Sequence, residues 1–306
     1  MMPRPTSSAP AAAGPPADRL RALLAAPGLH VMPCCFDALS ARLIERAGFP
    51  LTFMSGFAVS AARLALPDTG LISYGEMVER GREICAAVSI PVIGDGDTGY
   101  GNPVNVKRTV HGYARAGFAC VMIEDQLAPK RCGHTRGKEV VPRGEALARM
   151  RAALDARDEA RAAGHDILVM ARTDARAGHG LDEAIARGRA FAELGADIVF
   201  VEAPRDEAEL ARVAREIPVP TMANLVEDGD TPLLPPARLE ALGFRIAAYP
   251  LTLLHAAVYA MQEALAGLKA GRPLERRLSF AALRELLGFD AYDAESRRYA
   301  DDAAGS

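Results

Sequence analysis

Short apolar runs alternate along the chain, from residue 30 onward, with longer segments in which apolar residues recur at spacings of three and four. The short runs are rich in β-branched residues and are bounded by Gly, Pro or Asp, which is typical of buried strands, whereas the longer segments have the period of amphipathic helices. Each predicted strand is followed by a predicted helix. The pattern predicts strands at 30–33, 51–55, 91–94, 119–124, 167–172, 197–202, 221–224 and 245–249.

Helix boundaries support this order of elements. Asp37 is placed to cap a helix that runs to Ala47 and stops before Gly48, and Asp182 opens a helix that ends before Gly195. Eight strand–helix units with short connections favour a closed (β/α)8 barrel of the TIM type over an open doubly wound sheet. No GxGxxG motif follows the first predicted strand, which further weakens the dinucleotide-binding alternative.

The length of 306 residues would allow two domains of roughly 150 residues, but a barrel of about 250 residues forms one unit. We therefore expect a single barrel domain over 18–306, with a C-terminal helical extension that includes residues 281–299. Residues 1–17 are mostly Ala, Pro, Ser and Gly and lack the continuous apolar core of a secretory signal. This segment is expected to be a disordered tail.

Composition excludes several classes of protein. Half of the residues are hydrophobic (50%) and 25% are charged, which is ordinary for a globular chain. The formal charge is -3, and the sequence has no block of like charge that would bind a phosphate backbone. Nucleic acid is therefore not expected as a partner. The longest apolar stretch, near 247–261, is shorter than the roughly 20 residues of a membrane span and contains Pro250 and His255. The five cysteines are scattered without a CxxC pair, so we expect a reduced, cytoplasmic protein.

Polar residues stand where the predicted strands end. In a barrel the carboxyl ends of the strands surround the active site, so these side chains should converge on one mouth. The polar strand ends are Ser55-Gly56, Asp95-Gly96-Asp97, Glu124-Asp125, Arg172-Thr173-Asp174, Glu202 and Asn224.

Acidic residues at this mouth suggest a metal site. Strand alternation would aim the side chains of Asp95 and Asp97 the same way, and two such carboxylates repel each other unless a cation joins them. Glu124 at the next strand end and Asp68 in a nearby loop add further oxygen ligands, a set that suits Mg²⁺ or Mn²⁺ better than zinc. The alternative is that the two Asp residues are turn formers or helix caps.

The segment after the fourth predicted strand, residues 129–138, combines basic side chains with His134 and Cys132. Beside Lys130, Arg131 and His134 the pKa of the Cys132 thiol would be lowered, and the thiol could exchange a proton near neutral pH. The alternative is a solvated basic loop with an incidental cysteine. Arg172 in the mouth is a candidate for bidentate binding of a carboxylate; its structural alternative is an ion pair with Glu202 or Asp174.

The ordered set of motifs resembles the isocitrate lyase and phosphoenolpyruvate mutase superfamily, over about residues 30 to 268. The pieces that carry the resemblance keep their order and spacing throughout. They are Ser55-Gly56-Phe57, Leu66-Pro67-Asp68-Thr69-Gly70, Asp95-Gly96-Asp97-Thr98-Gly99-Tyr100-Gly101, Ile123-Glu124-Asp125-Gln126, Lys130-Arg131-Cys132-Gly133-His134, Ala171-Arg172-Thr173-Asp174, Glu202-Ala203 and Ala223-Asn224.

The resemblance implies a role for each matched position. Asp95 would ligate Mg²⁺ directly, and Asp97, Glu124 and Asp68 would hold the waters of the ion. A second group would bind substrate: Ser55, Gly56 and Phe57 its 2-oxo or 2-hydroxy acid end, and Arg172 a carboxylate. The full expected substrate-binding set is Ser55, Gly56, Phe57, Gly133, Arg172, Glu202 and Asn224.

The cysteine loop implies the lyase branch. In the superfamily this motif is absent from phosphonate mutases, whereas carbon–carbon lyases use the cysteine to protonate the departing carbanion. The resemblance therefore implies that Cys132 is a general acid after a retro-aldol cleavage that yields a 2-oxo acid such as pyruvate. It also implies a lid that closes over substrate, with Lys130, Arg131 and His134 as the other catalytic residues.

Two departures from the family pattern narrow the substrate. Val226 stands where isocitrate and methylisocitrate lyases carry Ser or Thr, and His255 stands where methylisocitrate lyases place Arg. Both missing groups would bind a third carboxylate, so we expect a dicarboxylate with an apolar substituent, such as a 2-alkylmalate or 2,3-dimethylmalate. The alternatives are 2-methylisocitrate lyase, oxaloacetate hydrolase and, more remotely, a carboxyphosphonoenolpyruvate or phosphonopyruvate mutase or hydrolase.

The family resemblance also implies assembly. Its members form dimers of dimers that exchange the C-terminal helix, so we expect a homo-oligomer that binds a small di- or tricarboxylate, with neither nucleic acid nor membrane as a partner. A barrel without activity that serves as a binding protein is the alternative outside enzymology. Failure to bind Mg²⁺ would favour it.

Overall fold

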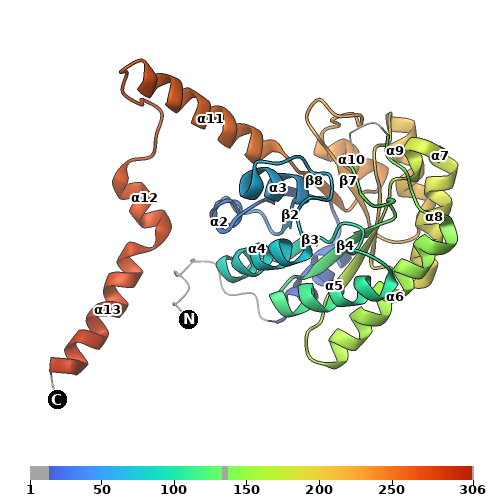
Figure 1. Cartoon of the computed structure of the whole chain (residues 1–306), viewed down its shortest axis with the longest axis horizontal. Coiled ribbons are helices and arrows are strands. Elements are labelled where there is room, and N and C mark those ends of the chain that lie inside the picture. Colours follow the sequence, from blue (N-terminus) through green and yellow to red (C-terminus); the bar gives the residue numbers. More distant parts are fainter. Residues whose placement is uncertain (1–13, 133–136, 305–306) are drawn as a thin grey trace. The chain divides into compact units, whose positions relative to one another are not determined.

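Eight parallel strands close into a barrel in the order β1 to β8 (Figure 1). The computed structural model describes residues 14–132 and 137–304. The strands are β1 His30–Cys35, β2 Thr52–Met54, β3 Val92–Asp95, β4 Cys120–Glu124, β5 Leu168–Thr173, β6 Ile198–Val201, β7 Thr221–Asn224 and β8 Ile246–Tyr249. The predicted (β/α)8 fold is confirmed, and all eight predicted strands are present with ends shifted by a residue or two.

The barrel is closed by the first and last strands. β1 pairs with β8 in parallel register from His30 opposite Ile246 to Pro33 opposite Tyr249. Helices surround the strands (Figure 1). In the barrel unit they are α1 Pro16–Ala25, α2 Ala38–Arg46, α3 Gly56–Leu64, α4 Tyr74–Ala87, α5 Pro103–Ala116, α6 Arg143–Ala162, α7 Ala175–His179, α8 Leu181–Leu194, α9 Glu207–Glu216 and α10 Pro236–Leu242. The chain continues with α11 Thr252–Lys269, α12 Phe280–Leu287 and α13 Phe289–Ala304.

The predicted helix signals act locally as expected, with one shift. Asp37 caps α2 by accepting a hydrogen bond from the Ser40 N–H, in a capping box. α8 ends before Gly195, as predicted, but Gly180 rather than Asp182 stands at its N-cap. Asp182 lies within the first turn instead, where a carboxylate still interacts favourably with the helix dipole.

α1 covers the end of the barrel opposite the expected mouth. Its side chains Ala17, Leu20 and Leu24 pack in one apolar cluster with barrel-interior residues such as Met32. The tail was expected to reach residue 17, but the helix already begins at Pro16, because proline is well suited to the first helical position and burial of Ala17 stabilises that turn. The prediction is therefore wrong for Pro16 and Ala17, and residues 1–13 lie outside the described residues.

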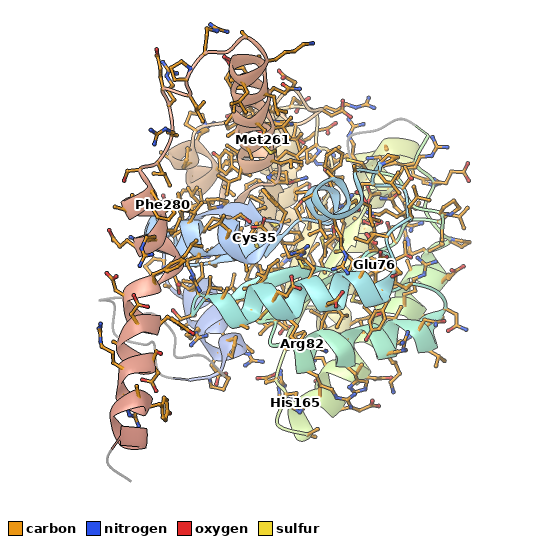
Figure 2. The ribbon with its side chains drawn as sticks, turned by 60° about the vertical axis from the view of Figure 1, so that its left-hand side comes forward. Cys35, Glu76, Arg82, His165, Met261 and Phe280 are labelled. Carbon is orange, nitrogen blue, oxygen red and sulfur yellow. The ribbon has the colours of Figure 1, made fainter. Side chains whose placement is uncertain are left out.

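Contacts divide the chain into two compact units, and the first contains the barrel and runs to His255. The second begins at Ala256 and holds most of α11 together with α12 and α13, so the helices expected within 281–299 are present. Large apolar side chains of this second unit are exposed, including Met261 (57%) and Phe280 (73%), which Figure 2 labels. Over the part of the chain that the structure describes, none of the helices is long and apolar enough to cross a membrane.

Candidate active site

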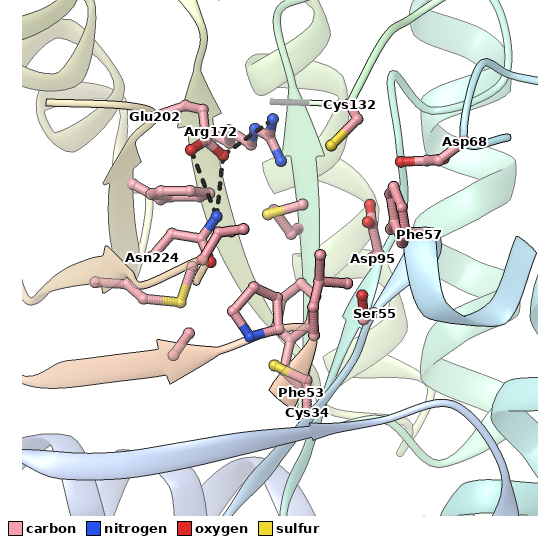
Figure 3. Close-up of a pocket in the computed structure, with 17 residues that line it drawn as sticks. Cys34, Phe53, Ser55, Phe57, Asp68, Asp95, Cys132, Arg172, Glu202 and Asn224 are labelled. Atoms are coloured by element: carbon pink, nitrogen blue, oxygen red, sulfur yellow. Dashed lines mark hydrogen bonds and ion pairs between the residues drawn. The ribbon is translucent and has the colours of Figure 1, made fainter. Parts of the chain in front are cut away.

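A cavity of about 530 Å³, measured with its open mouth, lies in the barrel unit (Figure 3). Its polar wall comes from residues at or just beyond the carboxyl ends of the strands, as a TIM-type barrel requires. The lining residues are Cys34, Phe53, Ser55, Phe57, Asp68, Asp95, Met122, Cys132, Arg172, Phe200, Glu202, Met222, Asn224, Val226, Ala248, Pro250 and Leu251.

Most of the expected site residues meet at this cavity. Those that line it are Ser55, Phe57, Asp68, Asp95, Cys132, Arg172, Glu202 and Asn224. Gly56, Asp97, Glu124 and Lys130 lie directly behind and contact lining residues. Arg131 is exposed and is not part of the lining. Gly133 and His134 fall outside the described residues.

Asp95 ends β3 and is held by two backbone donors. The Gly56 N–H donates to Asp95 Oδ2 at 3.2 Å, and the Asp97 N–H donates to Asp95 Oδ1 at 3.0 Å. A Cβ on residue 56 would lie 2.5 Å from Asp95 Oδ2, so glycine is required for this approach of α3. Burial, and next the neighbouring Asp97, raises the pKa of the Asp95 carboxyl.

Lys130 is the counter-ion of the acidic group. Its Nζ lies 2.5 Å from Asp68 Oδ1 and 2.7 Å from Asp97 Oδ1, and all three side chains are buried. Burial by itself would lower the pKa of Lys130, but Asp97 and Asp68 raise it well above its usual value. Lys130 is therefore a permanent cation, and its positive charge balances part of the negative charge of Asp68 and Asp97.

Asp97 does not follow the alternation of a strand. β3 ends at Asp95, and Asp97 has a φ of 48°, in the left-handed region that non-glycine residues seldom adopt. The expectation that alternation aims Asp95 and Asp97 the same way is thus replaced by a turn that brings Asp97 to Lys130. Such backbone outliers concentrate at functional sites.

Glu124 carries an unpartnered oxygen. Its Oε2 lies 3.3 Å from Arg172 Nε, whereas among the described residues its buried Oε1 has no hydrogen-bond partner. Burial raises the pKa of Glu124 well above its usual value, and Arg172 only partly opposes this. A buried carboxylate oxygen without a partner is costly unless a further cation or donor binds there.

These residues fit a hydrated divalent cation. Mg²⁺ prefers oxygen ligands and keeps several of its waters, so it needs few direct protein ligands. The described ranges contain no group of three or more His, Cys, Asp or Glu side chains close enough to ligate one ion together. The cluster contains more carboxyl groups than cations, and its cations are Lys130, Lys138 and Arg172. The carboxylates are Asp68, Asp95, Asp97, Glu124, Asp174 and Glu202.

Arg172 combines the two roles that the sequence left open. It lines the cavity, and it is also ion-paired: its Nε and Nη2 donate to Asp174, and its Nη2 lies 3.1 Å from Glu202 Oε2. Burial would lower the pKa of the guanidinium, but Asp174 and Glu124 raise it well above its usual value. Arg172 is thus a fixed cation held rigidly against the cavity (Figure 3).

Glu202 and Asn224 form the neighbouring wall. Asn224 Nδ2 lies 3.4 and 3.3 Å from the two carboxylate oxygens of Glu202, and the Ala203 N–H donates to Glu202 Oε1. Ala203 has a φ of 57°, a second outlier beside the cavity. In the view of Figure 3 this pair and Arg172 face Ser55 and Asp95 across the cavity, so a substrate with two polar ends could bridge them.

The rest of the cavity is apolar. Val226 is only 9% exposed and packs with Leu251 and Leu254. His255 is not part of the lining; its side chain is 52% exposed, and its Nδ1 lies 3.9 Å from Glu227 Oε2. Neither position therefore offers a donor to a third carboxylate inside the cavity.

Sequence reasoning missed several lining residues. Cys34, at the end of the first strand, could be expected to pack or to touch the pocket, with packing favoured; the structure shows that this buried thiol lines the cavity, and burial raises its pKa well above the usual value. The other missed lining residues include Phe53, Met122, Phe200 and Met222. Alternation along each strand is the signal that could have found them, because side chains two positions apart on a strand point to the same side. Each of these four residues stands two positions before a polar strand end and belongs to the apolar cluster inside the barrel.

Comparisons with known proteins agree with this architecture. The family model described as phosphoenolpyruvate phosphomutase matches residues 20–269. The chain is 42% identical over 288 residues to 2,3-dimethylmalate lyase from Eubacterium barkeri, with 93% of this chain and 98% of that protein covered. Its fold matches the structure of oxaloacetate acetylhydrolase in complex with the inhibitor 3,3-difluorooxalacetate, with a TM-score of 0.86 and 35% identity over 95% of this chain and 97% of that one.

A phosphonopyruvate hydrolase crystallised with oxalate and Mg²⁺ is also similar, with a TM-score of 0.82 and 34% identity over 94% of this chain and 99% of that one. These three relatives bear the names of three different reactions. Overall similarity therefore gives the scaffold and the region of the site, and the choice among reactions depends on the residues that line the cavity.

Proposed function

The chain is an enzyme of the phosphoenolpyruvate mutase and isocitrate lyase superfamily, and on that premise we propose that it is a lyase that cleaves a carbon–carbon bond of a 2-hydroxy dicarboxylate. The observation that carries the proposal is that Cys132, Asp95 and Arg172 line a single cavity, whose wall between the polar groups is apolar. Cys132 supplies a proton donor. Asp95 lies at the end of the cavity that binds one end of the substrate, and Arg172 lies at the end that binds the other.

The two polar ends of the cavity bind the two ends of the substrate. Arg172 is a buried permanent cation, and together with Asn224 it binds one carboxylate. At the other end, Ser55 Oγ accepts from the Ala58 N–H at the start of α3, which leaves its own O–H to donate to the 2-hydroxy acid group. The N-terminus of α3 adds a partial positive charge at this end.

The chemistry is a retro-aldol cleavage. A base takes the proton of the 2-hydroxyl group, the C2–C3 bond breaks, and its electron pair remains on C3, which becomes a carbanion next to the second carboxylate. C2 becomes the carbonyl of a 2-oxo acid. Cys132 donates its thiol proton to C3, which completes the second product as a simple carboxylate and leaves a thiolate. Lys130 lies two residues before Cys132. Its buried ion pairs with Asp68 and Asp97 fix the backbone beside this proton donor.

A bound Mg²⁺ would stabilise the negative charge that develops on the 2-oxygen. Asp95 would hold the ion directly, and Asp97, Glu124 and Asp68 would hold its waters. The unpartnered Glu124 Oε1 and the excess of carboxylates support this assignment. Mn²⁺ has the same ligand preference and could substitute.

The apolar wall selects the substrate. A third carboxylate placed against Val226 would lose its hydration without gaining a donor, because His255 is exposed outside the cavity. An alkyl group is stabilised there by burial. We therefore propose a 2-alkylmalate of the 2,3-dimethylmalate type as the substrate class, with pyruvate or a related 2-oxo acid as product.

We also propose that the protein is a homo-oligomer, a dimer of dimers, in a reducing compartment such as the cytoplasm. The cluster of exposed apolar side chains on α11, α12 and α13 supports a second copy as their partner, since single exposed residues are common but a run of them is not. The scattered spacing of the five cysteines, without a CxxC pair, supports the compartment.

The test is release of 2-oxo acid, coupled to lactate dehydrogenase, from 2,3-dimethylmalate, other 2-alkylmalates, 2-methylisocitrate and isocitrate, with oxaloacetate followed by its own absorbance. We expect a dialkylated malate to be the best substrate and a chelator to abolish turnover, with activity returning on addition of Mg²⁺. A preference for 2-methylisocitrate of about tenfold, or about 1.4 kcal/mol in the transition state, would overturn the substrate assignment. Oxaloacetate as the best substrate would make the enzyme a hydrolase.

A further inference from the structure

Gln126 binds the backbone of Arg131 with both ends of its side chain. Its Oε1 accepts a hydrogen bond from the Arg131 N–H at 2.9 Å, and its Nε2 donates to the Arg131 C=O at 2.9 Å. Gln126 follows β4 by two residues and is 1% exposed. Both ends of its carboxamide thus bind a single residue across the loop 127–130.

Gln126 is itself firmly anchored. Its backbone C=O accepts from Arg149 Nη1 of α6 at 2.8 Å, and it forms an isolated antiparallel bridge with Val140. The Leu127 N–H donates to the Glu139 C=O at 2.8 Å. Gln126 therefore contacts the chain before residues 133–136, at Arg131, and the chain after them, at Val140. Gln126 itself is buried and is held by Arg149 of α6.

Arg131 stands between two residues of the site. Lys130 precedes it and places its ammonium between two buried carboxylates, and Cys132 follows it and lines the cavity. Neighbouring Cα atoms are about 3.8 Å apart. Because both polar groups of the Arg131 backbone are fixed by Gln126, the backbone that carries Cys132 is held on its N-terminal side.

We propose that Gln126 is a positioning residue that holds the thiol of Cys132 at the cavity and keeps Lys130 among its acids. A carboxamide suits this task because it is uncharged and can donate and accept in one plane. Glutamate of the same size would keep the acceptor and lose the donor, and methionine would lose both. The kinetic part of this inference rests on the proposed function, whereas the reactivity of the thiol does not.

The variants Q126M and Q126E separate this role from a purely structural one, with E193M as the control at an exposed position of α8 in the barrel unit. The first readout is the alkylation rate of Cys132 by iodoacetamide, measured by mass spectrometry of its peptide in folded protein, with the partly buried Cys85 as internal reference. In Q126M we expect Cys132 to react faster by about threefold or more at an unchanged Cys85 rate, and in Q126E by less.

The second readout is steady-state kinetics. In Q126M we expect kcat to fall about tenfold or more and KM to change by less than about threefold, because proton donation is affected and substrate binding is not. A structural residue would lower the melting temperature and leave both the alkylation rate and kcat of the folded protein unchanged, and that result would overturn the proposal. If the wild type lacks lyase activity, the proposed function fails and the alkylation data still decide the role of Gln126.

Hydrogen exchange of the wild-type protein gives a test that needs no variant. The Arg131 amide should exchange about a hundredfold or more slower than an unstructured amide, since its acceptor is a buried and anchored side chain. Exchange at the unprotected rate would mean that the bond from Gln126 is not kept in solution and would contradict the proposal even if Q126M failed to fold.

Discussion

Arg172 and Asp174 are joined by two parallel hydrogen bonds, from Nε to Oδ2 at 2.8 Å and from Nη2 to Oδ1 at 3.0 Å. Asp174 is in turn held by its own backbone N–H, which donates to the buried carboxylate of Asp125 at 2.9 Å. The cation that faces the cavity is thus fixed from behind by a rigid pair of acids. Pre-organisation of this kind lets an arginine bind a carboxylate with little reordering of its side chain.

Removal of this cation should destabilise the fold. In Arg172→Met the buried carboxylates Glu124, Asp174 and Glu202 lose their common partner, so the free energy of unfolding in urea should fall by about 3 to 5 kcal/mol. The control is Arg215→Met, because the Arg215 side chain is largely exposed and lies 3.8 Å from Glu216. The control should lose less than about 0.5 kcal/mol. Equal losses in the two variants would argue against a tightly paired Arg172.

Loss of the proposed proton donor should affect turnover rather than binding. Cys132→Ser keeps the size of the side chain but replaces the thiol by a much weaker acid, so kcat should fall by about a hundredfold or more while KM changes by less than about threefold. Cys85→Ser, in α4 and away from the cavity, is the control and should keep full activity. Full activity of Cys132→Ser would instead favour the phosphonate branch of the superfamily.

The apolar wall should control the choice between di- and tricarboxylates. Val226→Ser introduces a hydroxyl donor at the cavity, so the ratio of kcat/KM for 2-methylisocitrate to that for 2,3-dimethylmalate should rise about tenfold or more. His255→Ala should leave this ratio within about twofold, because the histidine is exposed outside the lining. A large effect of His255→Ala would show that this residue reaches the substrate.

The base of the barrel should show a pH-dependent ion pair. Arg21 of α1 lies 2.6 Å from Asp166, just before β5. Burial raises the pKa of Asp166, but hydrogen bonds from Arg21 and Arg161 outweigh this, and the net pKa is lowered. Since the folded-state pKa lies below the unfolded value, the stabilisation is complete above the unfolded pKa of about 3.9 and is lost as pH falls through the folded pKa.

Asp166→Asn measures this contribution. The wild type should exceed the variant by about 1 kcal/mol at pH 7, a modest value because Arg21 is partly exposed and salt screens the pair. The difference should shrink towards zero near pH 2. A difference that stays constant from pH 7 to pH 2 would mean that the carboxylate charge is not its source.

The fold could be predicted from the sequence because each strand carried its own local signal. Strand runs at 119–124 and 167–172 are apolar and continuous, as in strands buried on both faces, and Asp37 and Gly48 mark the ends of α2. The rule that barrel sites lie at the carboxyl ends of strands then placed Ser55, Asp95 and Arg172 at one cavity.

Contacts between distant loops could not be predicted in this way. Lys130 was expected to take part in catalysis, but its pairing with Asp68 and Asp97 was not predicted. This pairing depends on how the barrel packs loops that are distant in sequence; Asp68 and Lys130 are about sixty residues apart. The two hydrogen bonds between Gln126 and the Arg131 backbone depend on side-chain geometry, which produces no periodic pattern in the sequence. The turn at Asp97 likewise overrode the alternation expected of a strand.

The most direct test of the account follows the proton that Cys132 is proposed to deliver. The enzyme is incubated with Mg²⁺ and 2,3-dimethylmalate in D₂O, and the products are identified by nuclear magnetic resonance and mass spectrometry. The account predicts pyruvate together with propionate that carries one deuterium at C2, the carbon of the broken bond, and predicts that Cys132→Ser forms this product at a small fraction of the rate. Recovery of unchanged substrate under conditions that restore Mg²⁺, or products without deuterium at that carbon, would contradict it.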